Sequence, residues 1–384
     1  MRERQIEALR QGDAVDVVLV HYRTPDLLLE SVEALRRDGE SSGLQVRPVV
    51  ADNGSTPRDR ERFEAAGLSV LWDGENGGYS AGVNRGASAG RAPWVVVMNP
   101  DVLVEPGCLG ALIEALREGA DCVGPRFFWD RQQTLLLPPN ERRGLFQELL
   151  SLQRFRSAAA GHRHRRRWRR HARRCWQATG PISCFELSGA LLAFPRSVWE
   201  RVGPFDEGYR LYFEETEWLL RLRRRGLCAR YVPSAHAVHL YNRSAAAEPH
   251  TARWFQESRE RYLHRAHGSW VARCALAAEA RWIPSPQDLA ASVAGAAGQP
   301  LDGPYLEQEL LASIRGKMAK GETLWLEISP APLGVPAAAV RFSSGEQSWR
   351  LPEETQRSLE AGEWSLRLVG DTGPELFRGT FQVS

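Results

Sequence analysis

Short apolar runs alternate with helix-like segments through the first hundred residues, and this alternation constrains the fold more than any other feature of the sequence. The first run, DVVLVH at Asp16–His21, is rich in β-branched residues and bounded by polar ones, as is typical of a buried parallel strand. A helical pattern begins at Pro25, and further strands are predicted at 45–51, 68–72 and 94–98, with a helix at about 58–66 and a small-residue segment at 80–90. Strands and helices that alternate at this pitch predict an α/β fold whose mainly parallel sheet has helices on both faces.

The length and composition of the chain are those of a folded protein with more than one core. Its 384 residues, 43% hydrophobic and 25% charged, suffice for one large domain and a smaller one. The stretch Met1–Val15 lacks the apolar core of a signal peptide, and no window approaches the run of about 20 apolar residues that a membrane-spanning helix requires. We therefore expect a cytoplasmic protein. The six cysteines are scattered without a CxxC pair, which argues against a zinc site or a disulfide framework.

The character of the sequence changes near Pro284. From there on, helix-like material is sparse, and alternating segments separated by Gly, Pro and Ser recur at 324–328, 338–342, 347–351, 364–368 and 377–383. These segments predict a small antiparallel sandwich. We therefore expect a large domain over residues 1–283, a linker and helical segment over 284–320, and an all-β, sandwich-like accessory domain over 321–384. Three roles of the accessory domain stay open: binding an acceptor glycan, pairing with a second subunit as a homodimer, and capping the large domain.

A basic insertion at about 140–180 interrupts the large domain. It contains an amphipathic helical pattern at Leu145–Phe155 and the run Gly161–Arg174, which holds eight arginines and no acid. Subtracting these eight charges from the net charge of +3 leaves the rest of the chain at about −5, which argues against a nucleic-acid partner because such proteins carry their basic excess more widely. Two interpretations of the run stay open: residues 163–174 contact anionic lipid headgroups, or they form a solvated loop.

Polar residues follow the predicted strands at the points where a parallel sheet binds its ligands. Ligands of an open parallel sheet lie outside the carboxyl ends of the strands. The first strand ends in His21-Tyr22-Arg23, the second in Asp52-Asn53, and the strand at 94–98 in Asn99-Pro100-Asp101. Taken alone, Asp52 would be an Asx-turn or helix-capping residue and Asp101 a turn residue. The combination of the three endings indicates a ligand site.

Six ordered motifs make the chain similar to family 2 glycosyltransferases of the GT-A fold, in particular to their bacterial rhamnosyltransferase-like branch. They lie within residues 15–243 and read DVVLVHYR, ADNGS, ENGGYSAGVNRG, MNPDV, LSGALLAFPRSVWERVGPFDEGYRLYFEETEWLLRLRRRG and VPSAHAVH. The resemblance implies a metal-dependent, inverting transfer of rhamnose or another hexose from a dTDP- or UDP-sugar to a hydroxyl of a glycan or lipid-linked acceptor. It also implies that the protein works in the cytoplasm, peripheral on the inner face of the plasma membrane, where many relatives extend polyprenyl-linked glycans.

The resemblance further implies which residues bind the donor. Asp52 occupies the place of the family's base-reading aspartate, whose carboxylate accepts the N3–H of a uracil or thymine ring. In the glycine-rich motif, Gly82 and Gly86 are expected to let the backbone approach the ligand closely. The remaining donor-binding residues that the resemblance implies are His21, Tyr22, Arg23, Gly77, Gly78, Asn84, Asn99, Ser188 and Gly189.

The resemblance implies a divalent metal at the next strand end. Asn99-Pro100-Asp101 occupies the place of the family's DxD signature, with an asparagine in the position of the first acid. Asp101 is expected to bind Mg²⁺ or Mn²⁺, which take carboxylate oxygens and share their coordination with a diphosphate. His239 matches a histidine that lies close to the metal and diphosphate in this family, and His236 is the fallback for that role.

The acidic cluster Glu214–Glu217 is the candidate for the chemistry. By itself it would complement the dipole of the helix that it begins. The resemblance implies that Glu215 is the base that takes the acceptor proton, and that Asp206 and Glu214 lie on the acceptor side.

Two departures from the family pattern leave an alternative open. The family has aspartates where this chain has Glu215 and Glu217. The alternative is therefore a catalytically degenerate GT-A-fold protein that binds a sugar nucleotide or a glycan. The retained Asp52, Asp101 and His239 favour the enzyme.

Overall fold

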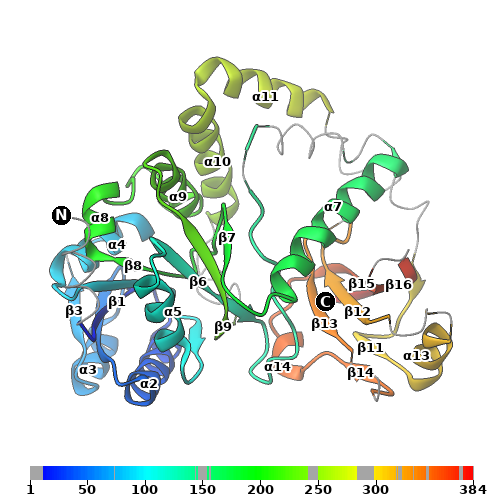
Figure 1. Ribbon diagram of the computed structural model, residues 1–384, viewed down its shortest axis with the longest axis horizontal. Coiled ribbons are helices and arrows are strands. Elements are labelled where there is room, and N and C mark those ends of the chain that lie inside the picture. The colour runs from blue at the N-terminus through cyan, green and yellow to red at the C-terminus, as the bar shows by residue number, and fades with distance from the viewer. Residues whose placement is uncertain are drawn as a thin grey trace. The chain divides into compact units, whose positions relative to one another are not determined.

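The computed structural model describes residues 12–383 except 73, 143, 146–153, 155–156, 241–249, 283–297, 317, 319–321, 332, 343–345 and 372–374. The chain divides into two compact units (Figure 1). The first comprises residues up to 127, 139–145 and 174–276, and the second comprises 128–138, 146–173 and the residues from 277 on. Most of the helix predicted at 145–155 and most of the predicted linker lie outside the described residues. So do the predicted limits at 283 and 321, and the division at those residues stays a proposal.

A nine-stranded sheet forms the centre of the first unit, in the order β3-β2-β1-β4-β8-β6-β9-β5, with β7 paired to β9. Its strands are β1 (Ala14–His21), β2 (Gln45–Asp52), β3 (Ser69–Trp72), β4 (Trp94–Met98), β5 (Val102–Val104), β6 (Cys122–Phe128), β7 (Ile182–Cys184), β8 (Leu191–Pro195) and β9 (Ala229–His239). The strands β3, β2, β1 and β4 pair in parallel, whereas β8, β9 and β5 join antiparallel. The predicted α/β class is confirmed, and the four strands predicted in the first hundred residues are the parallel part.

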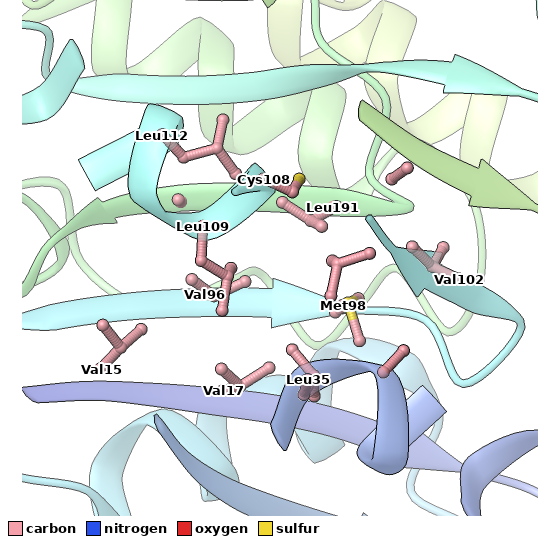
Figure 2. Packing of buried hydrophobic residues seen from close by; sticks show 14 of the residues in the cluster. Val15, Val17, Leu35, Val96, Met98, Val102, Cys108, Leu109, Leu112 and Leu191 are labelled. Atoms are coloured by element: carbon pink, nitrogen blue, oxygen red, sulfur yellow. The ribbon is translucent and has the colours of Figure 1, made fainter. Parts of the chain in front are cut away.

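Helices cover both faces of this sheet (Figure 1). They are α2 (Pro25–Ser42), α3 (Pro57–Ala65), α4 (Tyr79–Ala89), α5 (Cys108–Arg117), α8 (Arg196–Val202) and α9 (Glu214–Arg224). Helix α10 (Thr251–His267) packs on α9, and α11 (Ser269–Trp282) follows it. Alternate residues of β1 pack into two different hydrophobic layers, one on each face of the sheet, because side chains of a strand point to opposite faces. Val17 packs with α2 and α5, and Val18 packs with α4, α8 and α9. Figure 2 shows part of the first layer, with packed side chains from β1, β4, α2 and α5: Val15, Val17, Leu35, Val96, Met98, Leu109 and Leu112.

Two glycines set the distance between α4 and β1. A Cβ at Gly82 would lie 2.7 Å from Cγ1 of Val20, and a Cβ at Gly86 would lie 2.3 Å from Cγ1 of Val18. We expected these glycines to approach a ligand, and that expectation is wrong: they face the strand, because only a hydrogen fits between the helix and the valines. The close packing matters for function, since α4 begins at the candidate site.

A five-stranded sheet in the order β10-β16-β15-β12-β13 forms the second unit, together with the ribbon β11–β14. Its strands are β10 (Gln299–Pro300), β11 (Tyr305–Leu306), β12 (Leu324–Ser329), β13 (Ala338–Arg341), β14 (Trp349–Arg350), β15 (Gly362–Gly370) and β16 (Glu375–Val383), and its helices are α7 (Ala158–Trp176), α13 (Gln308–Arg315) and α14 (Glu353–Gln356). All five predicted C-terminal strands form. Leu306 of the ribbon and Leu326 of the sheet share one apolar core. Leu136 bridges Ala339, so a segment far away in the sequence joins this unit.

The arginine run forms the helix α7, which corrects the prediction of a solvated loop. Its inner face has partners: Trp168 is fully buried, and Arg169 donates to both carboxylate oxygens of Glu327 at 2.7–3.0 Å. The outer face consists of arginines that are exposed to solvent: Arg163, Arg166, Arg170 and Arg174. Within the part of the chain that the structure describes, every helix is too short or too polar for a membrane span.

Candidate active site

The ends of β1 and β2 meet as predicted, and their last residues are in contact. His21 and Asp52 are opposite each other in the parallel register, are fully buried, and hold Nδ1 3.2 Å from Oδ1. Nε2 of His21 accepts a hydrogen bond from the backbone N–H of Thr24 at 3.0 Å, so the ring proton lies on Nδ1 and faces the carboxylate. Tyr22 and Arg23 follow, with the guanidinium carbon 5.0 Å from the centre of the phenol ring and φ of Arg23 at 54°.

Asp52 forms the turn that its residue type suggested, and it also keeps an oxygen toward the site. Oδ1 accepts hydrogen bonds from the N–H groups of Gly54 and Ser55 and from the Ser55 hydroxyl, at 2.8–3.1 Å. Burial raises the pKa of Asp52, but the hydrogen bonds from His21, Gly54 and Ser55 outweigh burial and hold this pKa below its ordinary value. Oδ2 has no hydrogen-bond partner among the described residues and lies 3.5 Å from Nε of Arg60.

Three residues outside the predicted donor-binding set, Asn53, Arg60 and Trp72, lie beside these strand ends. The guanidinium carbon of Arg60 lies 4.0 Å from the ring centre of Trp72, which ends β3 and is 37% exposed. The side-chain amide of Asn53 donates to the carbonyl of Gly78 at 3.0 Å and accepts from Arg85 at 3.2 Å. Asn53 thereby joins the strand ends to the start of α4.

The pairing of β5 with β9 brings Asp101 and His239 together. Val102 is opposite His239 in this antiparallel register, and the N–H of Leu240 donates to the carbonyl of Asp101 at 3.0 Å. Nε2 of His239 lies 3.5 Å from Oδ1 of Asp101, whose side chain is 1% exposed. Among the described residues, no group of three or more His, Cys, Asp or Glu side chains could hold a metal ion. Asp101 and His239 are thus two neighbouring side chains that could hold a metal ion, and His236 bonds instead to the carbonyl of Pro233 at 3.1 Å.

The Tyr79 hydroxyl bonds to the segment that contacts Glu215. It donates to the carbonyl of Gly189 at 3.3 Å. Burial, and after it the negative charges of Glu214, Glu215 and Asp101, raise the pKa of Tyr79 well above its ordinary value. Three carboxyl groups from two distant stretches of the chain therefore lie within electrostatic range of one hydroxyl. In the sequence, the one signal for Tyr79 as a site residue is its position within the glycine-rich motif.

Small residues lie between Asp101's turn and Glu215. A Cβ at Gly189 would lie 3.0 Å from Cγ of Glu215, so the glycine leaves the glutamate its space. The N–H of Asn99 donates to the carbonyl of Ala190 at 2.9 Å, and Oγ of Ser188 accepts from the N–H of Ala190 at 3.3 Å. The segment 188–190 therefore contacts the end of β4 on one side and the start of α9 on the other.

The first turn of α4 docks onto the segment that precedes α9. The N–H of Tyr79 donates to the carbonyl of Arg210 at 2.9 Å, and the Ser80 hydroxyl donates to the carbonyl of Tyr209 at 2.7 Å. Gly78 has φ of 90°, and a Cβ there would lie 2.8 Å from Cγ of Arg210. Glycine is thus required at 78 both for its backbone conformation and for the close contact.

Asn84 belongs to this docking contact, and its role in ligand binding stays a prediction. Its amide nitrogen donates to the Phe205 carbonyl at 2.9 Å and to Oε1 of Glu207 at 2.8 Å, and its oxygen accepts from the Phe205 N–H at 2.8 Å. Asp206 in the same turn accepts from Arg261 through both carboxylate oxygens, at 2.9 and 3.0 Å. Both side chains hold the turn that leads to α9.

Comparisons with known proteins decide the family. The sequence model described as "Glycosyl transferase family 2" matches residues 16–186. The N-acetylglucosaminyl-diphospho-decaprenol L-rhamnosyltransferase of Mycobacterium tuberculosis (strain ATCC 25618 / H37Rv) is 32% identical over 256 residues, which cover 62% of this chain and 79% of that protein. The chain belongs to glycosyltransferase family 2. Rhamnosyltransferase WbbL of Escherichia coli (strain K12) is 37% identical over 81 residues, 20% of this chain and 30% of that protein.

The first turn of α9 contains three glutamates, Glu214, Glu215 and Glu217. Glu214 is 6% exposed, and its Oε2 has no hydrogen-bond partner within the described ranges. Burial, and after it the charge of Glu215, raise the pKa of Glu214 well above its ordinary value. Glu214 therefore stays protonated to a higher pH than an exposed glutamate.

Two residues with strained backbone conformations precede the first turn of α9. Tyr212 and Phe213 have φ of 68° and 66°, in the left-handed region that non-glycine residues rarely adopt. Phe213 is held by aromatic rings of α10, with centroid distances of 5.4 Å to Phe255 and 5.6 Å to Tyr262. Strain of this kind persists where packing over-determines it, and it clusters at functional sites.

Glu217 is used differently from the other acids. Its carboxylate is 1% exposed and accepts from Nε of Arg221 at 2.8 and 3.0 Å, with Arg265 at 3.5 Å. Arg221 also donates to the carbonyls of Val202 and Pro204, at 2.9 and 2.7 Å. The acid that takes the place of the family's second aspartate thus ties α9 to the turn before it.

Replacing Glu214 with glutamine should stabilise the enzyme increasingly as pH rises. Because the folded-state pKa is raised, the fold holds a proton that the unfolded chain releases above its own pKa, and wild-type stability falls with pH in that window. A glutamine holds no titrating proton. We expect the difference in Tm between Glu214→Gln and wild type to grow from about pH 5 to about pH 8. Glu200→Gln, at an exposed position of α8, is the matched control. A Glu214→Gln difference that stays constant across this range would contradict the assignment.

Proposed function

We propose that this glycosyltransferase moves rhamnose or another hexose from a dTDP- or UDP-sugar to a hydroxyl of a glycan or lipid-linked acceptor, with inversion at the anomeric carbon. The observation that carries the proposal is the segment 188–190, which contacts Glu215, the Tyr79 hydroxyl and the strand end that precedes Asp101. The relatives support the sugar and the acceptor class, since both are rhamnosyltransferases and one is named for a diphospho-decaprenol acceptor.

We propose that the nucleoside binds at the ends of β1, β2 and β3. Oδ2 of the ionised Asp52 is the acceptor for the N3–H of a uracil or thymine ring, because Oδ1 is occupied by the turn. The exposed ring of Trp72, already stacked with Arg60, offers an aromatic surface beside this oxygen. A pyrimidine presents both an N–H and a flat apolar face, which this pair of groups would recognise.

We propose that Asp101 and His239 hold a Mg²⁺ or Mn²⁺ ion together with the donor. A buried carboxylate and an imidazole 3.5 Å apart suit two positions of such an ion, and diphosphate oxygens would complete its coordination. The ion would neutralise charge on the departing diphosphate. Asn99, which is uncharged, leaves the protein side with one carboxylate, so we expect the ion to bind weakly until the donor arrives.

We propose Glu215 as the catalytic base. Its carboxylate takes the proton of the acceptor hydroxyl while the hydroxyl oxygen bonds to the anomeric carbon and the bond from that carbon to the diphosphate oxygen breaks. The electron pair of the broken bond leaves with the nucleoside diphosphate, and attack from the opposite side inverts the carbon. The raised pKa of Glu214 limits the negative charge that this residue adds beside the base.

A catalytically degenerate sugar-nucleotide or glycan-binding protein is the second candidate. The engagement of Glu217 by Arg221 favours it, since this acid is unavailable for chemistry. Slow hydrolysis of the donor in the presence of Mn²⁺ would separate the two, because a protein that only binds the donor leaves it intact.

Glu215→Gln should lower turnover by roughly 10²- to 10⁴-fold, the usual contribution of a general base. Donor affinity should stay within about twofold, because the base faces the acceptor and not the nucleotide. Product formation and calorimetric titration of the donor measure the two effects. Glu200→Gln again serves as the control and should transfer sugar at the wild-type rate. Near-wild-type transfer by Glu215→Gln would remove this residue as the base.

We also propose that the enzyme works in the cytoplasm on the inner face of the membrane, with the outer face of α7 as its contact. The helix contains no acid, and its exposed arginines recur every three or four residues, which places them on one side: Arg163, Arg166, Arg170 and Arg174. Each arginine near an anionic leaflet contributes about 1 kcal/mol of attraction.

Replacing these four arginines with glutamine should weaken binding to anionic vesicles by roughly 1,000-fold. A matched variant loses the same charge from exposed positions elsewhere: Arg201, Arg225, Arg341 and Arg357. Flotation of both variants with vesicles of phosphatidylglycerol measures the difference. Equal binding of the two variants would dismiss this face as the contact.

A further inference from the structure

A row of charged side chains crosses the sheet of the second unit. Glu327, Arg367 and Arg378 are opposite one another on β12, β15 and β16. Cross-strand partners lie on the same face of a sheet, and like charges placed directly opposite destabilise it. Helix α7 adds to this face, because Arg169 binds Glu327 through two hydrogen-bonding nitrogens. The arginine pair at 367 and 378 therefore needs compensation.

Arg367 is buried without sufficient partners. Its side chain is 1% exposed, and its Nε lies 3.2 Å from Oε2 of Glu375. Neither Nη1 nor Nη2 has a hydrogen-bond partner within the described part of the chain. The turn at Gly334 presses against the guanidinium, since a Cβ there would lie 0.9 Å from Nη1. Buried donors left unmet cost free energy, and such groups are rare in folded proteins unless a ligand or water meets them.

Arg165 of α7 approaches the same place. Its Nη1 lies 3.7 Å, and a side-chain carbon of Leu333 lies 3.5 Å, from the position of a Cβ at Gly161. The first half of α7 thus meets the turn that contains Leu333 and Gly334, and this turn also covers Arg367. Burial lowers the pKa of Arg165; Glu375 opposes this, whereas two neighbouring arginines reinforce it.

The cluster carries more positive than negative charge. Four guanidinium groups share this region with two carboxylates, which leaves two positive charges in excess: Arg165, Arg169, Arg367 and Arg378 against Glu327 and Glu375. Burial lowers the pKa of Arg367 to about 10; Glu375 opposes this and the three neighbouring arginines reinforce it. Nε of Arg378 is also buried without a hydrogen-bond partner among the described residues.

We propose that Arg165, Arg367 and Arg378 form a binding site for a phosphate-class dianion. Two negative charges match the excess, and tetrahedral oxygens fit the forked N–H donors of guanidinium groups. Arg169 is excluded from the ligand set because Glu327 already occupies its fork. The site is separate from glycosyl transfer and uses none of the residues assigned to it. Its anion comes either from free phosphate or from the headgroup of a phosphomonoester lipid, and the chemistry of recognition is the same.

Inorganic phosphate should stabilise the full-length protein in the presence of EDTA. Binding to the folded state alone raises Tm with ligand concentration, and we expect an increase of roughly 3 °C over chloride at equal ionic strength. The EDTA removes divalent metal, so that phosphate held by a metal ion does not contribute. No increase over chloride would overturn the proposal.

Variants locate the site. Arg367→Met and Arg378→Gln should each remove most of the phosphate-induced increase, whereas Arg341→Gln, at an exposed position of the same sheet, should retain it. Asp101→Asn should also retain it, which separates this site from the donor site. An undiminished increase in both Arg367→Met and Arg378→Gln would contradict the assignment.

The behaviour of the variants without phosphate provides a second readout. Arg367→Met removes an under-compensated buried charge, so its Tm in chloride should equal or exceed that of wild type. A purely structural arginine would give a lower Tm instead, and that result would count against an anion site. Arg378→Gln, at a half-buried position, keeps the test decisive if Arg367→Met fails to fold.

Vesicles separate the two sources of the anion. Flotation with vesicles of phosphatidic acid in phosphatidylcholine, compared with phosphatidylcholine alone, should depend on Arg378 if the lipid headgroup is the ligand. Free phosphate should then compete with the vesicles. Phosphate stabilisation without Arg378-dependent flotation assigns the site to the free anion. Both results support the shared chemistry of the site.

Discussion

The docking of α4 onto the segment before α9 is the contact on which the candidate active site depends. The hydrogen bond from the Tyr79 N–H to Arg210 fixes the start of the helix, and Asn84 fixes its second turn. Glycines at 82 and 86 let the same helix lie directly on β1. The donor-side strand ends and the acids of α9 are thereby both joined to the start of α4, because Asn53 bonds to Gly78 and the Tyr79 hydroxyl bonds to Gly189, which lies against Glu215. Without this contact, the two halves of the site would belong to different parts of the fold.

The sequence predicts the parallel strands and the polar residues at their ends, because strand periodicity and the ligand position in open sheets are local or general properties. The sequence predicts less well which way the residues of a helix face. Gly82 and Gly86 were assigned to the ligand and face β1. A helix has several faces. The sequence of the helix alone does not show which face packs on the sheet and which face binds a ligand. Tyr79 was missed because its environment is assembled from residues far apart in the sequence.

In the second unit, too, the sequence predicts the strands but not the contacts between distant segments. Alternation in the sequence predicts its five C-terminal strands, since each strand has one apolar and one polar face. The membership of 128–138 and of the arginine helix is not predicted, because it rests on contacts such as the bridge from Leu136 to Ala339 and the ion pair between Arg169 and Glu327. Such contacts join positions 158 or more residues apart and leave no local pattern. An arginine run therefore looks like a loop until its acidic partners are placed.

The central claim is that carboxylates from separate stretches of the chain converge at one edge of the sheet to bind a pyrimidine diphosphate with its metal ion. A crystal structure with dTDP and Mn²⁺, recorded at the manganese absorption edge, tests it most directly. The account predicts an anomalous peak in contact with Asp101 and His239, and the thymine N3 within hydrogen-bond distance of Oδ2 of Asp52. A manganese peak or a nucleotide bound away from these residues would contradict it.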